Sequence, residues 1–168
     1  MTRLLRSSKF WLLERALLVI IALTIAGVSV VAQTARKNPA PAGDVEPVFL
    51  DYRGVKIGWL ADEVRKKLGS PNNKGEEQDF YIINEKETCQ IFYDKATKQV
   101  TAISVDFSNG AREILTPQQV FGEDIEAKSD GSKSRLVRYP KAGFWVSYNR
   151  TGGETPIITV TIQKLPPQ

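Results

Sequence analysis

Two stretches of the chain alternate between apolar and polar residues with a period of two, which is the pattern of half-buried β-strands. In residues 89–107 and again in residues 144–162, apolar side chains fall at every second position of two short segments. The two stretches match without a gap at an offset of 55 residues. Turn-rich connections at 95–99 and 150–155 join the segments, so each stretch is predicted to form an antiparallel hairpin.

A short helical pattern precedes each hairpin. Residues 60–68 carry acidic side chains in the first turn and basic ones in the last, which suits the helix dipole, and Gly69 supplies a stop. Ahead of the second hairpin, Thr116 is a favourable N-cap, Pro117 a favourable first helical residue, and Gly122 a stop. Each hairpin is therefore expected to follow a short helix.

These patterns predict an α+β domain over residues 48–165. It would consist of two helix–β-meander repeats, at about 55–108 and about 110–163, with a further strand ahead of each hairpin near 80–83 and 136–139. Helices and strands that are apolar on one side bury those sides against each other. We therefore expect one antiparallel sheet with the short helices on one face, preceded in the chain by an N-terminal apolar helix.

The N-terminal helix is predicted from residues 16–32, which contain no charged residue and follow several basic ones. This arrangement is typical of a segment that directs the rest of the chain across a membrane. Small residues before Gln33 allow a signal peptide cleaved after Ala32, while the length of residues 1–32 also suits an uncleaved signal-anchor helix. The domain would be membrane-anchored outside the cytoplasm or, if cleaved, periplasmic or secreted. Residues 33–47, with three prolines, are predicted to form a flexible spacer.

Composition excludes several classes of function. The net charge of +4 comes mainly from the N-terminal segment, because residues 33–168 carry 19 basic and 18 acidic side chains. Nucleic-acid binding, which needs a clustered positive field, is disfavoured. The chain has no histidine and a single cysteine, so histidine-based triads and histidine-bearing zinc sites are excluded. We expect no catalytic residue, no metal site and no cofactor.

Alternation assigns the side chains of the predicted strands to two faces. One face collects the apolar residues and is expected to form the core: Cys89, Ile91, Tyr93, Ile103, Val105, Phe107, Phe144, Val146, Tyr148, Ile158, Val160 and Ile162. The other face is mainly small and polar. On it, Phe92, Trp145, Asp106, Ser147 and Thr159 are the predicted partner-binding residues, since aromatic anchors dominate protein interfaces. The alternative is that each ring is covered by a loop or is simply half exposed.

Other candidate sites have simpler explanations. Cys89 falls on the core face, where it is expected to be a small buried hydrophobe. Asp94 and Asp106 could be imagined as a carboxylate pair, but neither has the predicted burial that shifts a pKa. The basic run at 133–141 is predicted to be a solvated strand. The glycosylation sequon that begins at Asn149 also suits a turn.

Several segments resemble the small exported domains of the SmpA/OmlA (BamE) type. They are residues 58–64 (GWLADEV), 67–71 (KLGSP), 91–94 (IFYD) and 100–103 (VTAI). More broadly, the tandem pattern is similar to the β-lactamase-inhibitor-protein fold. The resemblance implies a helix pair against a curved antiparallel sheet and a non-enzymatic, protein-binding role. The chain departs from the lipoproteins of that type, because it has no cysteine near residue 33.

The sequence therefore predicts an exported, non-catalytic binding or assembly module of the cell envelope that acts through its sheet face and loops. The expected partner is an envelope protein, with membrane contact through the N-terminal segment. The alternative is a secreted protein inhibitor of an extracytoplasmic enzyme, which the fold resemblance also permits.

Overall fold

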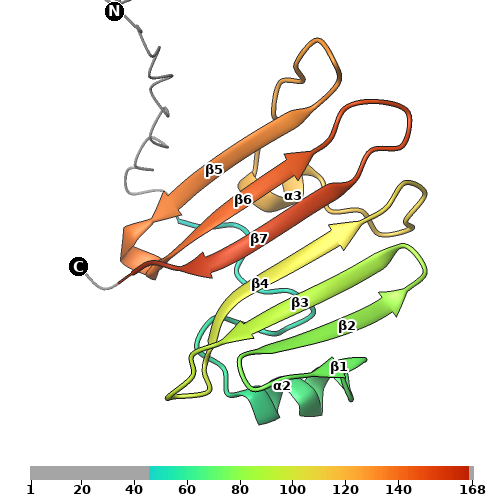
Figure 1. Cartoon of the computed structure of the whole chain (residues 1–168). Helices are drawn as coiled ribbons and strands as arrows, with labels where there is room; N and C mark the ends of the chain where they lie inside the picture. Colours follow the sequence, from blue (N-terminus) through green and yellow to red (C-terminus); the bar gives the residue numbers. More distant parts are fainter. Residues whose placement is uncertain (1–45, 167–168) are drawn as a thin grey trace, which may run out of the picture. The chain divides into compact units, whose positions relative to one another are not determined.

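The computed structural model describes residues 46–166, which form an α+β domain with one antiparallel seven-stranded sheet (Figure 1). The predicted fold class is confirmed at this level. The predicted targeting segment, residues 1–32, lies outside the described residues, as does all of the spacer except residues 46–47. Within residues 46–166, no helix is long and apolar enough to cross a membrane.

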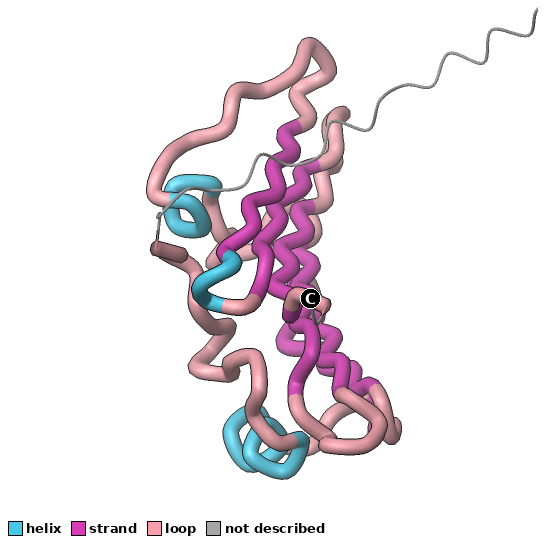
Figure 2. The backbone as a smooth tube through the Cα atoms, turned by 90° about the vertical axis from the view of Figure 1, so that its left-hand side faces the viewer, coloured by secondary structure: helices cyan, strands magenta, loops and turns pink. Residues whose placement is uncertain are grey.

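The strands are arranged so that the C-terminal hairpin meets the N-terminal meander at the middle of the sheet. The strand order is β1-β2-β3-β4-β7-β6-β5, and every neighbouring pair is antiparallel. Both α-helices of residues 46–166 lie on the same side of the sheet (Figure 2). In chain order the elements are α2 (Ala61–Leu68), β1 (Asn73–Lys74), β2 (Gln78–Asn84), β3 (Glu87–Tyr93), β4 (Val100–Phe107), α3 (Pro117–Phe121), β5 (Lys133–Tyr139), the 3-10 turn η2 (Pro140–Ala142), β6 (Phe144–Arg150) and β7 (Ile158–Lys164).

The β3–β4 and β6–β7 hairpins have the same register. Cys89 lies opposite Val105 in the first ladder, and Val146 lies opposite Ile162 in the second. Each residue of the second pair lies 57 positions after its counterpart in the first, two more than the offset of 55 predicted from the sequence. A shift of two residues leaves every side chain on its own face of the sheet. The predicted faces are therefore the same with an offset of 55 or of 57.

The core lies between the sheet and the helices. All twelve residues of the predicted core face are buried, and Val64 of α2 and Val120 of α3 are fully buried beside them. As predicted, Thr116 is the N-cap of α3 and the left-handed Gly122 ends it. The side chain of Gln119 completes a capping box with Thr116, which was not predicted. Because α3 has only five residues, this cap and the packing of Val120 and Phe121 hold it in place rather than helix propensity.

A buried ion pair fastens α2 to the edge of the sheet. Asp79 of β2 is completely buried and points to the helix side, where Arg65 donates from Nε at 2.8 Å and from Nη2 at 3.1 Å. The Tyr93 hydroxyl donates to the same carboxylate at 2.8 Å. The hydrogen bonds from Arg65 to Asp79 raise the pKa of the guanidinium, so Arg65 stays charged. The sequence predicted only that the basic residues of α2 suit the helix dipole. The structure shows in addition that Arg65 pairs with Asp79.

Candidate functional site

The side of the sheet opposite the helices is called the open face. Register places its side chains in three rows that cross β2, β3, β4, β7, β6 and β5 in that order. The first row is Gln78, Phe92, Ala102, Gln163, Trp145 and Arg138. The second row is Phe80, Gln90, Ser104, Thr161, Ser147 and Leu136. The third row is Ile82, Thr88, Asp106, Thr159, Asn149 and Ser134.

Large apolar side chains lie on the outer strands of the open face, and small or polar ones lie on the two central strands. Phe80, Ile82 and Phe92 are on β2 and β3, while Leu136 and Trp145 are on β5 and β6. Between them, β4 and β7 contribute only alanine, serine, threonine, glutamine and aspartate to the three rows. The open face is therefore a polar strip two strands wide with an apolar border on each side.

The polar strip is held together by hydrogen bonds across the β4–β7 seam. The Thr159 hydroxyl donates to the Asp106 carboxylate at 2.6 Å, and the hydroxyl oxygens of Ser104 and Thr161 are 3.2 Å apart. Asp106 is half-buried and is the only acidic residue in the three rows. These contacts hold four of the six side chains of the strip against each other across the seam.

All five residues predicted to bind a partner lie on the open face. Asp106 and Thr159 are in direct contact, and Ser147 is buried one strand away, opposite Thr161. Phe92 and Trp145 share the first row but do not touch, because three strand spacings, about 14 Å, separate them. Both rings are half-buried. Figure 2 shows the helices on the opposite side of the sheet, so within residues 46–166 neither helix covers these rings.

The other residues considered from the sequence have structural roles. Cys89 has no exposed surface, and burial, followed by the nearby Glu87 charge, raises the pKa of its thiol to about 12. Asp94 lies in the β3–β4 turn, where its carboxylate accepts from the backbone of Thr97 and Ala96. The hydrogen bond from Thr97 lowers the Asp94 pKa. Cys89 is therefore a buried core residue, as predicted, and the Asp94 carboxylate stabilises the turn between β3 and β4.

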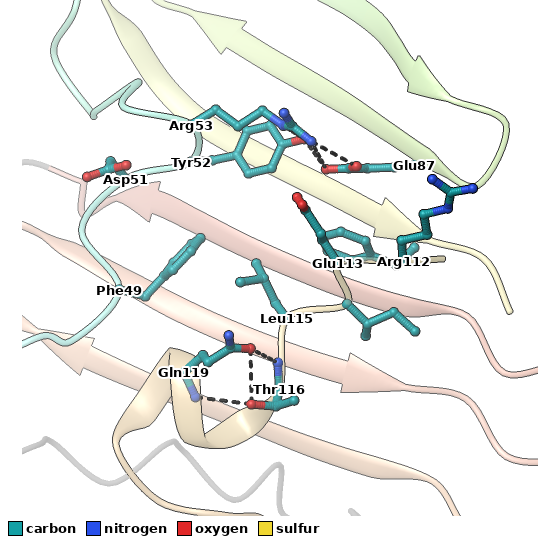
Figure 3. Close-up of a pocket in the computed structure, with 12 residues that line it drawn as sticks. Phe49, Asp51, Tyr52, Arg53, Glu87, Arg112, Glu113, Leu115, Thr116 and Gln119 are labelled. Carbon is teal, nitrogen blue, oxygen red and sulfur yellow. Dashed lines mark hydrogen bonds and ion pairs between the residues drawn. The ribbon is translucent and has the colours of Figure 1, made fainter. Parts of the chain in front are cut away.

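A pocket of about 790 Å³ lies on the helix side of the sheet, between residues 49–53 and residues 112–119 (Figure 3). Phe49 and Leu115 point into it, and the Arg53–Glu87 ion pair lines its upper rim in the figure. Its size is in the range of small-molecule sites. This pocket was not predicted from the sequence, because its walls are brought together by two loops.

The charged groups of this pocket are largely engaged with each other. Buried Glu87 accepts from the Tyr52 hydroxyl at 2.5 Å, from Arg53 Nη2 at 3.0 and 3.1 Å, and from Asn84 Nδ2 at 2.9 Å. Burial, followed by the hydrogen bond to Glu87, raises the pKa of Tyr52. With both oxygens of Glu87 occupied, the carboxylate joins Tyr52 and Arg53 to β3 and has no lone pair directed at a ligand.

The burial of Glu87 and Asp79 could have been predicted from the alternation of core and open-face positions along β2 and β3. Glu87 precedes Cys89 by two positions and Asp79 precedes Tyr81 by two, so both fall on the core face. A charge at a core position requires a partner.

Among residues 46–166, no group of three or more histidine, cysteine or acidic side chains is placed to hold a metal ion.

No protein-family model, curated protein or solved structure matches the chain. The resemblance to the SmpA/OmlA (BamE) type and to the β-lactamase-inhibitor-protein fold therefore stays a prediction based on the residues quoted for it.

Proposed function

We propose that this chain is an exported, non-catalytic module that binds a partner protein of the cell envelope through its open face. The observation that carries the proposal is the first row, where Phe92 and Trp145 stand half-buried on either side of two small or polar positions, Ala102 and Gln163. Rigid aromatic rings around hydrogen-bonding side chains are the composition of many protein-binding surfaces.

The charge of the open face supports a protein as the ligand. Asp106 and Arg138 are the only charged residues in the three rows, and Asp106 is already hydrogen-bonded to Thr159. Phosphate backbones and anionic lipid headgroups are bound through clustered cations, which this face lacks. An uncharged amphipathic segment laid along β4 and β7 would place its polar side on the strip and its apolar flanks on the two borders. A helix, about 10–12 Å across, matches the spacing of about 14 Å between the two aromatic positions.

The two aromatic positions are not a by-product of an internal repeat. We infer that the two helix–meander halves are copies of one unit, which the common register at an offset of 57 supports. Under this correspondence Phe92 matches Asn149, and Trp145 matches Thr88, both of which lie in the third row at the other end of the strands. Duplication alone would give both ends of the face the same residue types. Aromatic residues at one end only support a binding role for that end.

The N-terminal segment supports an envelope location. Basic residues followed by seventeen uncharged ones would export the domain and place it beside membrane-bound partners. N-terminal sequencing of the mature protein distinguishes an anchored scaffold from a product released after Ala32.

Site-specific photocrosslinking in native membranes tests the open face directly. A photoreactive residue at Gln163, which is exposed between the two rings, should give a discrete protein adduct, whereas one at exposed Glu63 on α2 should not. Trp145→Ala should abolish the Gln163 adduct, and Leu60→Ala, which trims an exposed apolar residue at the start of α2, should leave it intact. Equal adducts from Gln163 and Glu63, or an adduct unaffected by Trp145→Ala, would refute the proposal.

A further inference from the structure

The two edges of the sheet are protected to different degrees. On one edge, β1 pairs with β2, and Asn72 Oδ1 accepts from the Ile82 backbone N–H at 2.7 Å. On the other edge, β5 pairs with β6 on its inner side. Among the described residues, no other hydrogen bond reaches the backbone of residues 134–138. An antiparallel strand directs half of its N–H and C=O groups to each side, so β5 presents a row of these groups outward.

The cations on β5 do not block this edge as fully as its sequence suggests. Lysine and arginine on an edge strand normally prevent pairing with another chain. Lys133, however, is tied to Asp124 at 2.9 Å, and Arg135 is tied to Glu123 at 2.7 Å and stacks over the Phe121 ring. Both therefore point to the helix side of the sheet, and Arg138 is the one cation of β5 that lies on the open face. The ladder with β6 runs without a bulge over all seven residues, so the strand is straight enough to accept a neighbour.

We propose that β5 is a dimerisation edge, at which a second copy of this chain adds its own β5 in antiparallel orientation around a two-fold axis at Leu136. This inference is independent of partner binding by the open face. The resulting sheet would run continuously through both copies.

The sequence of β5 is self-complementary in this register. Leu136 faces Leu136 of the second copy, and the other pairs are Lys133 with Tyr139, Ser134 with Arg138, and Arg135 with Val137. Three of the seven residues are cationic, yet no cation lies directly opposite another cation. Directly opposite like charges destabilise a strand pair and apolar pairs stabilise it, so this register favours a second copy as the occupant.

Disulfide crosslinking of the full-length protein in mild detergent tests the axis. Oxidation of Leu136→Cys should produce a covalent dimer, because the same residue meets itself at the axis. Ile82→Cys is the matched control, since Ile82 is an exposed open-face residue of β2 near the opposite edge. The native Cys89 is buried and is not expected to react. If Leu136→Cys gives no more dimer than Ile82→Cys, or crosslinks only to a different protein, self-pairing is overturned.

A mixing experiment tests the register. Ser134→Cys and Arg138→Cys proteins should crosslink to each other when mixed and should not crosslink when oxidised separately. Efficient crosslinking of each protein alone would overturn the proposed register.

A non-covalent measurement completes the test. Leu136→Asp would place two carboxylates opposite each other and should raise the dimer dissociation constant by roughly tenfold or more in sedimentation equilibrium. Phe80→Asp, at the far end of the same row, should leave the dissociation constant unchanged. A wild-type protein that is monomeric, or a Leu136→Asp variant that dimerises as well as the wild type while remaining folded by circular dichroism, would refute the dimerisation edge.

Discussion

Ser104 of β4 and Thr161 of β7 lie directly opposite each other, with their hydroxyl oxygens 3.2 Å apart, at the centre of the sheet. They belong to the only ladder among the described strands that joins elements distant in the sequence. The seam is therefore the middle of the polar strip, and it joins the meander of β1 to β4 to the strands β5 to β7.

The Arg65–Asp79 pair allows a buried and an exposed carboxylate to be compared on the same arginine. Asp79→Ala should lower the free energy of unfolding by about 3–5 kcal/mol, because it leaves Arg65 and the Tyr93 hydroxyl without their acceptor. Asp62 also contacts Arg65, at 3.4 Å, but its side chain is 96% exposed, so Asp62→Ala should cause no measurable loss. Urea titration of both variants is the measurement. Equal effects would show that Asp79 does not act as the anchor of α2.

Two tyrosines on neighbouring strands should respond differently to removal of the hydroxyl. The Tyr93 hydroxyl donates to Asp79, so Tyr93→Phe should cost about 1–3 kcal/mol. The buried Tyr81 hydroxyl has no hydrogen-bond partner among the described residues, so Tyr81→Phe should change stability by less than about 1 kcal/mol and could increase it. Thermal unfolding of the two variants under identical conditions decides the matter. A larger loss for Tyr81→Phe would contradict the assignment.

Stability should decline at alkaline pH. Burial raises the pKa of the Cys89 thiol from 9.0 to about 12 and that of Tyr81 from 10.0 to about 12. Between these values the unfolded chain loses protons that the folded chain retains, so the free energy of unfolding falls as pH rises through this window. Below the unfolded pKa values the contribution is complete, and stability should be insensitive to these groups.

Urea midpoints measured from neutral pH to about pH 11 would follow this decline. Cys89→Ala should make it shallower near pH 9, whatever its effect on stability at neutral pH. A slope that is the same in wild type and variant would show that the thiol is not protected by burial.

Aromatic residues on the two faces of the sheet should differ in their contribution to stability. Phe107 is buried in the core, and Phe107→Ala should cost about 3–5 kcal/mol. Trp145 is half-buried on the open face, and Trp145→Ala should cost no more than about 1–2 kcal/mol. Denaturant titration compares them. A loss for Trp145→Ala as large as that for Phe107→Ala would indicate a structural rather than a partner-binding ring.

The faces of the strands could be predicted from the sequence, whereas their exact register could not. Alternation with period two places Cys89 and Ile91 in the core and Phe92 on the open face. This assignment holds for every register in which the strands pair same face to same face. The pattern is unchanged by a shift of two residues, so it does not fix which residues of neighbouring strands lie opposite each other. Strand β1 was not predicted, because its two exposed residues carry no periodic pattern.

The contacts that hold residues 52–53 and α2 against the sheet could not be predicted from the sequence either. Arg53 lies 34 residues from Glu87, and Arg65 lies 14 residues from Asp79. Which residues so far apart in the sequence come into contact depends on how the loops and the helix pack on the sheet. No local sequence pattern identifies such pairs. The five predicted open-face residues are on one face, but their spacing across the strands, and hence the separation of Phe92 from Trp145, required the strand order.

The seam between β4 and β7 also has a consequence for folding kinetics. Every other strand pairing closes a short loop between consecutive strands, whereas this one must bring together segments with two further strands and a helix between them. Closing that long loop costs chain entropy before the pairing is gained. Strands β1–β4 and strands β5–β7 are therefore expected to pair among themselves early, and the β4–β7 ladder is expected to form last. Formation of that ladder would then be the rate-limiting step in refolding.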